Sequence, residues 1–389
     1  MRKLNQKIKN LSDYPFDRLR ELLSKVILPE NSRVIDLSIG QPYHDIPSFV
    51  KSTILNAGEK WHLYPPIAGI KDLRAAYLGW LKRRFKLDKN FFSEDILPLS
   101  GTREGLFSVV LTLNINNIIV PNPFYQAYLG ASLFQNLNIK YLGSDNANNS
   151  FFDLEDLEKN LKGKRSLVYF CSPSNPQGKV ASFLYIKKLI NLVRKHDAVL
   201  IVDECYTDIF FKKIPEGAIK VCEELGEGLK NILIFHSLSK RSNVAGMRSG
   251  FVVGDKEIIY LFKRLRSYSA PSMPIPIQLA SAKLWNDEKH VLRNRQEYEK
   301  KFNYANRVFS EYEFYEKTEA GFYLWINVGN GSNFAKELYK EHLIKVMPGE
   351  YLANGEKNNP GKKYIRIALV HNFIESRNAI NKIAQLLKC

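Results

Sequence analysis

The sequence predicts an α/β protein whose large domain has a mostly parallel central sheet and whose smaller domain is α+β. Short, continuous apolar runs have the length and composition of strands that are buried on both faces. These runs are residues 117–120, 166–170, 198–202, 232–236 and 250–253. Segments with helical periodicity separate several of them, notably 184–196 and, less clearly, 218–225. Alternating strands and helices are typical of a parallel sheet that helices cover on both sides.

The C-terminal part of the chain has a different pattern. Helical stretches between Ala280 and Phe309 lead to an apolar run at Gly321–Ile326, two further short runs at 343–347 and 364–369, and a closing helix at 374–387. Residues 349–363 are polar, with Gly and Asn, and are predicted to form a surface loop. An amphipathic helix is expected around residues 16–26. We therefore expect a large domain at 45–275 and a small domain formed by 1–44 and 276–389.

Composition limits the class of protein. The 389 residues are 45% hydrophobic and 25% charged, as in an ordinary globular protein. No apolar run approaches the roughly 18 residues that a membrane-spanning helix needs, and the basic N-terminus lacks the apolar core of a secretory signal. The four cysteines show no CxxC spacing, which argues against a disulfide framework or a metal site and favours a reducing cytoplasm.

The formal charge of +17 has two interpretations. Basic proteins often bind nucleic acid, but here the Lys and Arg residues are spread along the chain, with only short clusters such as 82–84 and 362–363. No basic-aromatic interleaving resembles an RNA-binding motif. We favour a solvated basic surface that steers anionic substrates and expect no nucleic-acid or membrane partner.

Polar residues collect directly after the predicted strands, at the edge where open α/β sheets bind ligands. In the segment 237–248, Ser237, Ser239 and Lys240 follow a strand, with Gly246 and Arg248 shortly after. Hydroxyl and guanidinium groups suit a phosphate, and a lysine beside a phosphate site can form a Schiff base. The alternative is a basic loop with a turn glycine.

Three other segments carry weaker signals. Asp203 closes a buried run, and a protonated pyridine nitrogen would compensate such an acid; a helix N-cap is the alternative. Asn175 belongs to a turn, Asn-Pro-Gln-Gly, and its amide can also donate to a phenolic oxygen of a cofactor. The segment 100–105 is a glycine turn before an apolar helix expected at 106–113, and the free N–H groups at a helix start can bind phosphate; Ser100 or Thr102 as a plain cap is the alternative.

In combination, these motifs resemble the class I/II aminotransferases of fold type I, which depend on pyridoxal 5'-phosphate. The resemblance covers nearly the whole chain. It rests on residues 40–42, Tyr64 with Gly69 and 73–74, residues 100–102, 175–178, 203–206 and 237–240, and on Arg248 and Arg366. Gln177 stands where the family often has Thr.

The resemblance implies specific roles for these residues. Lys240 is expected to carry the cofactor as a Schiff base and to act as general base and acid. Asp203 would pair with the pyridine nitrogen, Asn175 and Tyr206 would hydrogen-bond the ring oxygen, and Tyr125 would stack on the ring. The residues expected to hold the phosphate are Gly101, Thr102, Arg103, Ser237 and Arg248.

The same resemblance implies a substrate site and a partner. Arg366 would bind the substrate α-carboxylate, helped by Gly40 and Asn175; without the resemblance, a surface salt bridge is the preferred interpretation of Arg366. Tyr64 would reach the phosphate of a second subunit, so a homodimer with shared active sites is expected.

Several strings are most similar to the bacterial succinyldiaminopimelate transaminases of lysine and diaminopimelate biosynthesis. They are residues 101–104, 121–128, 203–206, 236–254, 285–288, 321–325 and 366–370. Ala245, where Pro is expected, and Thr207-Asp208 depart from that pattern.

This likeness implies ping-pong transamination between glutamate and 2-oxoglutarate on one side and N-succinyl-diaminopimelate and its 2-oxo form on the other. Alternatives on the same fold are a transaminase for aspartate, alanine or an aromatic amino acid, or a C–S β-lyase. A ligand-binding regulator on this fold is a further alternative. It is disfavoured because such regulators usually carry an added DNA-binding domain, whereas this sequence begins directly with the enzyme-like segment.

Overall fold

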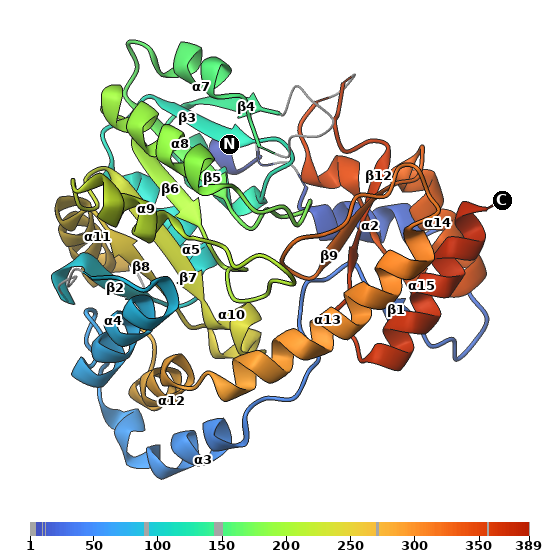
Figure 1. Cartoon of the computed structure of the whole chain (residues 1–389), viewed down its shortest axis with the longest axis horizontal. Helices are drawn as coiled ribbons and strands as arrows, with labels where there is room; N and C mark the ends of the chain where they lie inside the picture. The colour runs from blue at the N-terminus through green and yellow to red at the C-terminus, as the bar shows by residue number, and fades with distance from the viewer. Residues whose placement is uncertain are drawn as a thin grey trace.

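The computed structural model describes residues 5–9, 11, 13–88, 93–143, 151–269, 272–355 and 358–388. Two lobes, each with its own sheet, lie side by side (Figure 1). The larger lobe contains a seven-stranded sheet in the order β2-β8-β7-β6-β5-β3-β4. These strands are β2 (Ile96–Leu99), β8 (Gly250–Gly254), β7 (Ile232–Ser237), β6 (Val199–Asp203), β5 (Ser166–Cys171), β3 (Asn117–Pro121) and β4 (Asn138–Leu142).

Strand direction decides which residues meet at the ligand-binding edge. Strands β7, β6, β5, β3 and β4 pair in parallel, whereas β8 pairs antiparallel with both β7 and β2. Strand β2 therefore ends at the same edge as β7, and β8 begins there. Gly250 at the start of β8 is paired with Ser237 on one side and Leu99 on the other. Residues just before β8 and just after β2, β5, β6 and β7 thus share one edge.

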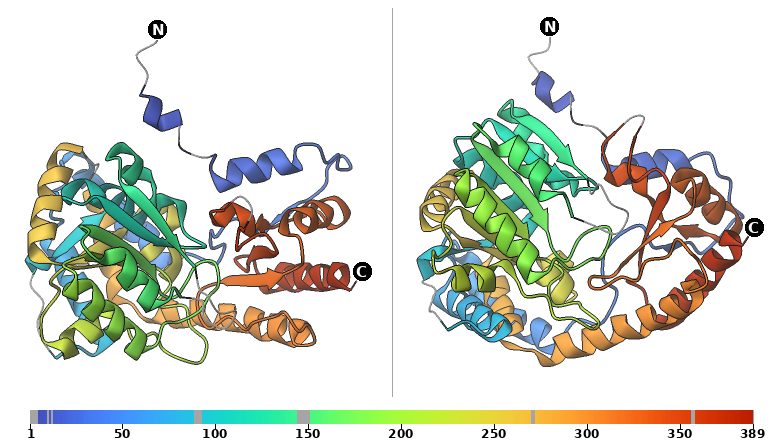
Figure 2. Two further views of the ribbon diagram at one scale, coloured as in Figure 1. Left: turned by 90° about the horizontal axis from the view of Figure 1, so that it is seen from above. Right: turned by 45° about the horizontal axis from the view of Figure 1, so that its top comes forward.

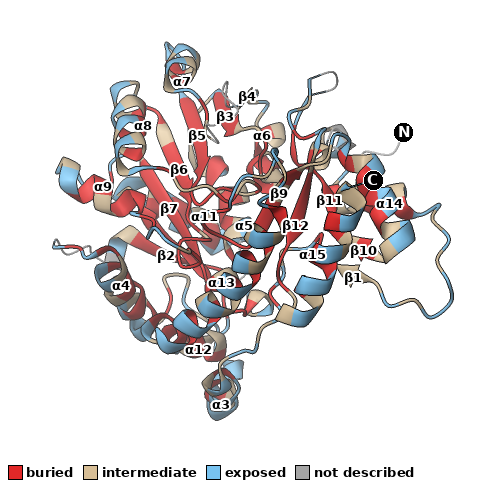
Figure 3. Cartoon of the chain, turned by 45° about the vertical axis from the view of Figure 1, so that its right-hand side comes forward, coloured by how far each residue is buried: buried red, intermediate tan, exposed pale blue. Residues whose placement is uncertain are grey.

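Helices cover both faces of this sheet. One core contains apolar residues of α4 (Lys71–Phe85), α8 (Phe183–Lys195), α9 (Ala218–Leu225) and α12 (Ile275–Asn286). The core on the opposite face includes residues of α5 (Thr102–Ser108) and α11 (Lys256–Ser269). Val202 belongs to the first core and its neighbour Ile201 to the second, as expected for successive residues of a strand. Figure 3 shows the inner strands of this sheet as buried along most of their length.

The smaller lobe is built on a three-stranded antiparallel sheet of β11 (Met347–Pro348), β12 (Tyr364–Ala368) and β9 (Tyr323–Asn327). A short parallel pair, β1 (Ile35–Asp36) with β10 (Ile344–Lys345), ties the N-terminal segment to it. Helices α2 (Pro15–Leu23), α14 (Gly331–His342) and α15 (Phe373–Leu387) belong to this lobe. Helix α13 (Lys289–Phe309) runs from the larger lobe to the smaller one (Figure 2).

The strands and helices that the sequence predicts are present, with ends that shift by a few residues. The edge strands β2 and β4 were not predicted. Strand β4 is partly exposed and lacks a continuous apolar run. The helix expected at 106–113 begins at Thr102 and continues as a 3-10 turn at Val109–Thr112.

The prediction of a surface loop at 349–363 is wrong for the first residues of this segment. Gly349–Leu352 forms a 3-10 helix in which Gly349 and Leu352 are buried. Leu352 packs with Leu19 and Leu23 of α2, and these apolar contacts outweigh the polar composition of the segment. Residues 356–357 of this segment lie outside the described residues.

Three features limit the kinds of site. Within the described part of the chain, no helix has both the length and the apolar character to cross a membrane. The same residues include no group of three or more His, Cys, Asp or Glu side chains that could hold a metal ion. Cys171, Cys205 and Cys222 are free thiols, and Cys389 lies outside the described residues.

Candidate active site

A cavity of about 1150 Å³ opens at the carboxyl edge of the large sheet, and residues of both lobes line it. Most of the predicted site residues line this one cavity: Gly40, Thr102, Arg103, Tyr125, Asn175, Asp203, Tyr206, Ser237, Lys240, Arg248 and Arg366. Gly101 lies directly behind the lining, in contact distance of Arg248. Tyr64 does not line the cavity and is fully exposed.

Lys240 lies in the short helix α10 (Leu238–Arg241), which follows β7 without a loop. The Ser237 hydroxyl caps this helix by accepting a hydrogen bond from the Ser239 N–H at 3.1 Å. The Lys240 amine donates to the Gly40 carbonyl and has no carboxylate among the ion pairs of the described chain. Burial lowers the pKa of Lys240; Tyr323 and Cys205 oppose the shift, and Arg366 and Arg103 add to it. A larger fraction of this amine is therefore neutral than in an exposed lysine.

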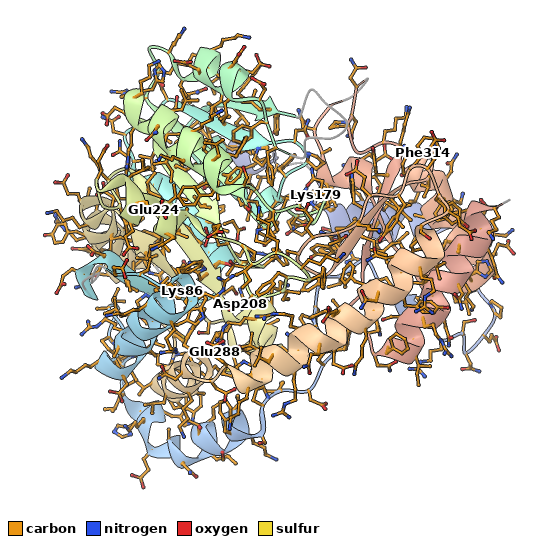
Figure 4. The ribbon with its side chains drawn as sticks, viewed as in Figure 1. Lys86, Lys179, Asp208, Glu224, Glu288 and Phe314 are labelled. Carbon is orange, nitrogen blue, oxygen red and sulfur yellow. The ribbon has the colours of Figure 1, made fainter. Side chains whose placement is uncertain are left out.

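Arg241 anchors α10 from behind. Its Nε donates to Asp208 Oδ2 at 2.8 Å and its Nη2 to Glu288 Oε1 at 2.7 Å. The other Asp208 oxygen accepts from Arg84 Nε at 2.8 Å. Asp208 and Glu288 are labelled on the α10 side of the larger lobe in Figure 4. Burial alone would raise the pKa of Asp208, but Arg241 and Arg84 outweigh it and lower that pKa, so the carboxylate is charged.

Asp203 ends β6 and points its carboxylate into the cavity. The Tyr128 hydroxyl donates to Oδ2 at 2.9 Å and the Cys205 N–H to Oδ1 at 3.2 Å. No helix follows Asp203, so it is not a helix N-cap. Burial raises the pKa of Asp203, and the hydrogen bonds from Cys205 and Tyr128 oppose this. A buried carboxylate without a cationic partner is costly, and a cation in the cavity would compensate it.

A cradle of hydroxyl and guanidinium groups lies where β2, β7 and β8 meet. Thr102, Ser237 and Arg248 line it together. Gly101 has a φ of +81°, and a Cβ on it would lie 2.0 Å from Arg248 Nη2. Glycine is therefore required for the Arg248 guanidinium to approach this turn. The arrangement suits a phosphate group.

Arg366 approaches the cavity from β12 of the smaller lobe and is 5% exposed. Its Nη1 donates to Asn175 Oδ1 at 3.1 Å and its Nη2 to the Ser38 carbonyl at 2.8 Å. Its guanidinium lies 4.3 Å from the centre of the Tyr323 ring. The ion pairs of the described residues do not include Arg366, so it forms no surface salt bridge. The guanidinium is held in place and remains able to receive a carboxylate.

The structure adds residues that the sequence motifs did not identify. Tyr128 lies three residues after Tyr125 and contacts the Asp203 carboxylate. The spacing from Tyr125 was the only feature of the sequence that could have indicated a place for Tyr128 in the site. Tyr323 belongs to the predicted apolar run at 321–326, and its hydroxyl lies 3.3 Å from the Tyr206 hydroxyl. The Tyr125 hydroxyl accepts from Arg103 Nε at 2.6 Å.

These residues fit pyridoxal 5'-phosphate. An amine without an acid partner suits its aldehyde, an uncompensated carboxylate suits its pyridine nitrogen, and the cradle that a Cβ at Gly101 would fill suits its phosphate. Fold and site together define a pyridoxal-phosphate-dependent enzyme of fold type I.

Comparisons with known proteins give the family. Residues 32–383 match the model of aminotransferase class I and II, and the chain belongs to this family. A crystal structure of an aminotransferase from Neisseria meningitidis is 37% identical, with a TM-score of 0.92, over 98% of this chain and 100% of that one. The aminotransferase AspB from Helicobacter pylori is 34% identical, with a TM-score of 0.89, over 97% and 99%. An LL-diaminopimelate aminotransferase from Dehalococcoides mccartyi is 28% identical over 98% of each chain.

The protein is therefore a pyridoxal-phosphate-dependent aminotransferase, an enzyme that exchanges an amino group between amino acids and 2-oxo acids.

Proposed function

We propose that this aminotransferase transfers the amino group of glutamate to N-succinyl-2-amino-6-oxopimelate, by a ping-pong mechanism. The products are 2-oxoglutarate and N-succinyl-diaminopimelate. One observation carries the proposal. The Lys240 amine of the larger lobe and the Arg366 guanidinium of the smaller lobe line the same cavity, which has a volume of about 1150 Å³. The likeness of the motifs to succinyldiaminopimelate transaminases supports the choice of acceptor.

Lys240 acts on the substrate Cα in this proposal. When bound, pyridoxal phosphate supplies an electron sink for the negative charge that develops at that carbon. The Lys240 amine would take the proton from the substrate Cα and later give a proton back to the substrate–cofactor adduct, which requires the neutral form that burial favours. Asp203 keeps the proton on the pyridine nitrogen, and Asn175 and Tyr206 donate to the ring oxygen.

The remaining predicted residues bind and orient. Thr102, Ser237, Arg248 and the turn at Gly101 and Arg103 hold the phosphate, and Tyr125 covers one face of the ring. Arg366 binds the α-carboxylate in two parallel hydrogen bonds, next to the Gly40 backbone and Asn175. This contact fixes which substrate hydrogen faces Lys240.

The outer part of the cavity supports a long acceptor. Tyr14, Gln41, Gln126 and Asn354 line it in addition to the cofactor residues. Their hydroxyl and amide groups can hydrogen-bond an amide and carboxylates remote from the reacting carbon. N-succinyl-2-amino-6-oxopimelate carries such groups.

Assembly, domain division and location are part of the same proposal. We propose a homodimer in which the exposed Tyr64 reaches the phosphate of the second subunit. Separate apolar cores in the two lobes support a division into two domains, which the sequence predicts at 45–275 and at 1–44 with 276–389. Leu284 and Trp285 of α12 pack in the larger core, which favours a boundary after Asn286. A cytoplasmic location agrees with the free thiols Cys171, Cys205 and Cys222.

The curated relatives favour a second candidate. Several of them are named LL-diaminopimelate aminotransferase, with 25–28% identity over nearly the whole chain. The acceptor would then be the corresponding 2-oxo acid without the succinyl group. Both candidates use the same reacting carbon and differ in the remote end of the substrate.

A substrate panel tests the proposal. Purified enzyme with pyridoxal phosphate would be given glutamate and one acceptor at a time: the succinylated 2-oxo acid, its free counterpart, oxaloacetate, pyruvate or an aromatic 2-oxo acid. The expected result is the highest kcat/KM with the succinylated acceptor. A higher value with the free acceptor would support the second candidate. A preference for another acceptor, or release of pyruvate and ammonia from cystathionine, would overturn both.

A further inference from the structure

A continuous set of hydrogen bonds, each buried or partly buried, joins the main chain of Lys240 to the smaller lobe. The Asn294 amide nitrogen donates to the carbonyls of Lys240 and Arg241, at 3.3 and 3.2 Å. Asn294 Oδ1 lies 2.6 Å from His44 Nδ1. The other ring nitrogen, His44 Nε2, lies 2.7 Å from Lys301 Nζ.

Lys301 completes the set at the smaller lobe. Its Nζ donates to the carbonyls of Leu369 and His371, both at 2.7 Å. These residues follow β12 directly, three and five positions after Arg366. The two ends of the network therefore lie beside the base and beside the guanidinium of the active site.

With Lys301 protonated, the chemistry of the groups allows only one direction for these bonds. An ammonium group has three donors and no acceptor, so in this form Lys301 donates to both carbonyls and to His44 Nε2. His44 must then carry its proton on Nδ1 and donate to Asn294 Oδ1. The amide NH₂ of Asn294 is consequently turned toward the carbonyls of Lys240 and Arg241. Each assignment forces the next one.

The path crosses between the lobes. Asn294 and Lys301 both lie on α13, the helix that runs from one lobe to the other (Figures 1 and 2). His44 lies on the segment that connects β1 to α3 (Ser48–Asn56). The same segment carries Gly40, whose carbonyl accepts from the Lys240 amine. The Lys240 main chain and side chain are thus both tied to elements that link the lobes.

The burial of the polar groups in this network costs free energy of folding. Lys301 is 1% exposed and Asn294 is 5% exposed. The charged groups that act on Lys301 and His44 are Glu297 and Asp45, and neither forms an ion pair with them within the described chain. A methionine would fill the place of Lys301 without a buried charge, so stability does not account for it.

We propose that Asn294, supported by His44 and Lys301, is a positioning residue for Lys240. It fixes the carbonyls of residues 240 and 241 and thereby couples the placement of the Lys240 amine to the strand that carries Arg366. The proposal rests on the proposed roles of Lys240 and Arg366. Asn294 acts through the main chain and does not touch the substrate.

The test compares Asn294→Ala with Asn306→Ala. Asn306 lies on the same helix and accepts a hydrogen bond from the Tyr315 hydroxyl, away from Lys240. The measurements are the pH midpoint of the visible absorption change of the cofactor-loaded protein, the cofactor Kd, kcat and KM for glutamate, and the melting temperature of the apo-protein. For Asn294→Ala we expect a shifted midpoint and a kcat lowered about tenfold or more, because small misplacements of a catalytic group are costly. Asn306→Ala should match the wild type in both.

A loss of melting temperature in Asn294→Ala, with midpoint and kcat within about twofold of the wild type, would mean a structural role only and would overturn the proposal. If Asn294→Ala does not fold, Lys301→Met is measured in the same way against Lys300→Met. Lys300 is exposed and, among the described residues, pairs only with Glu297. An unmoved midpoint in Lys301→Met would then overturn the proposal.

The wild type separates this inference from the proposed function. Borohydride reduction should trap the cofactor on Lys240, and glutamate should be converted to 2-oxoglutarate. If either fails in the wild type, the proposed function fails, irrespective of Asn294. If both succeed and the Asn294 and Lys301 variants behave as the wild type, only the positioning role is lost.

Discussion

The Tyr128 hydroxyl donates a hydrogen bond to the Asp203 carboxylate at 2.9 Å, beneath the cavity that the cofactor fits. Tyr128 is fully buried and stacks on Tyr169 with the ring centres 4.5 Å apart. This bond stabilises the ionised form of Asp203 against burial, which raises the pKa of that carboxyl group.

Tyr128→Phe should weaken cofactor binding. Without the hydroxyl, the pKa of Asp203 rises further and less of the carboxylate is available to the pyridine nitrogen. A hydrogen bond to a charged group contributes about 1.5–3 kcal/mol, which corresponds to a Kd for pyridoxal phosphate raised about 10- to 150-fold. Fluorescence titration of the apo-protein would measure it.

Tyr169→Phe is the matched control. The Tyr169 ring stacks on the ring of Tyr128, but the Tyr169 hydroxyl donates to the Leu106 carbonyl at 2.5 Å and not to Asp203. We expect a loss of stability without a comparable change in Kd. Equal effects of the two variants on Kd would contradict the role given to Tyr128.

Asp203→Asn should separate cofactor attachment from catalysis. Lys240 is unchanged, so borohydride should still trap the cofactor on it. The amide cannot keep the pyridine nitrogen protonated, and the removal of such a preorganised electrostatic contact lowers kcat by about 100-fold or more. Steady-state transamination with glutamate measures this, and a kcat near that of the wild type would exclude the pairing.

The sequence was sufficient to predict Lys240, Asp203 and Arg248 as neighbours for a physical reason. Each lies at or close to the end of a buried strand, and strand ends of a mostly parallel sheet meet at one edge. The contacts of Tyr128 and Lys301 could not be predicted in this way. Both arise where residues distant in sequence pack together, and the sequence does not specify that packing.

The same limit explains two of the errors in secondary structure. Strand β4 alternates between exposed and half-buried residues at the sheet edge and lacks the apolar run by which the inner strands are recognised. Gly349–Leu352 is buried only because α2 packs on it, a contact more than 300 residues apart in sequence. Local composition contains neither signal.

Arg366→Ala should mainly raise KM for glutamate. The guanidinium is buried, and loss of one partner of a buried charge pair costs about 2–5 kcal/mol in binding. Arg366→Lys should restore part of this, because a lysine keeps the charge but cannot form two parallel hydrogen bonds. Arg377→Ala, at an exposed position of α15, is the control. An unchanged KM in Arg366→Ala would exclude the carboxylate contact.

Arg241→Met should destabilise the fold. Arg241 is 2% exposed, and its removal leaves Asp208 with one fewer cation in a buried site. The loss of one member of a buried pair costs about 3–5 kcal/mol in the free energy of unfolding, which urea denaturation of the apo-protein would measure. Arg264→Met, on the exposed side of α11, should change this free energy by less than about 0.5 kcal/mol. Similar values for the two variants would contradict the anchoring of α10 by Arg241.

Lys301 predicts a pH dependence of stability with a defined sign. Burial lowers the pKa of Lys301 from its ordinary value of 10.5 to about 7. Between these values the unfolded chain binds a proton that the native state has released, so the free energy of unfolding rises with pH. The rise is up to about 1.4 kcal/mol per pH unit. Below pH 7 the penalty is fully present.

Lys301→Met removes this contribution at every pH. The difference in free energy of unfolding, wild type minus variant, should therefore be constant below about pH 6 and increase steadily from pH 7 to 10. Urea denaturation of both apo-proteins across this range measures the difference, in which the titrations of all other groups largely cancel. Lys300→Met is the control, because it removes an exposed amine and leaves the buried amine of Lys301 in place, so its difference should lack this rise. Parallel curves for the wild type and Lys301→Met would mean that the buried amine keeps its ordinary pKa in the native state.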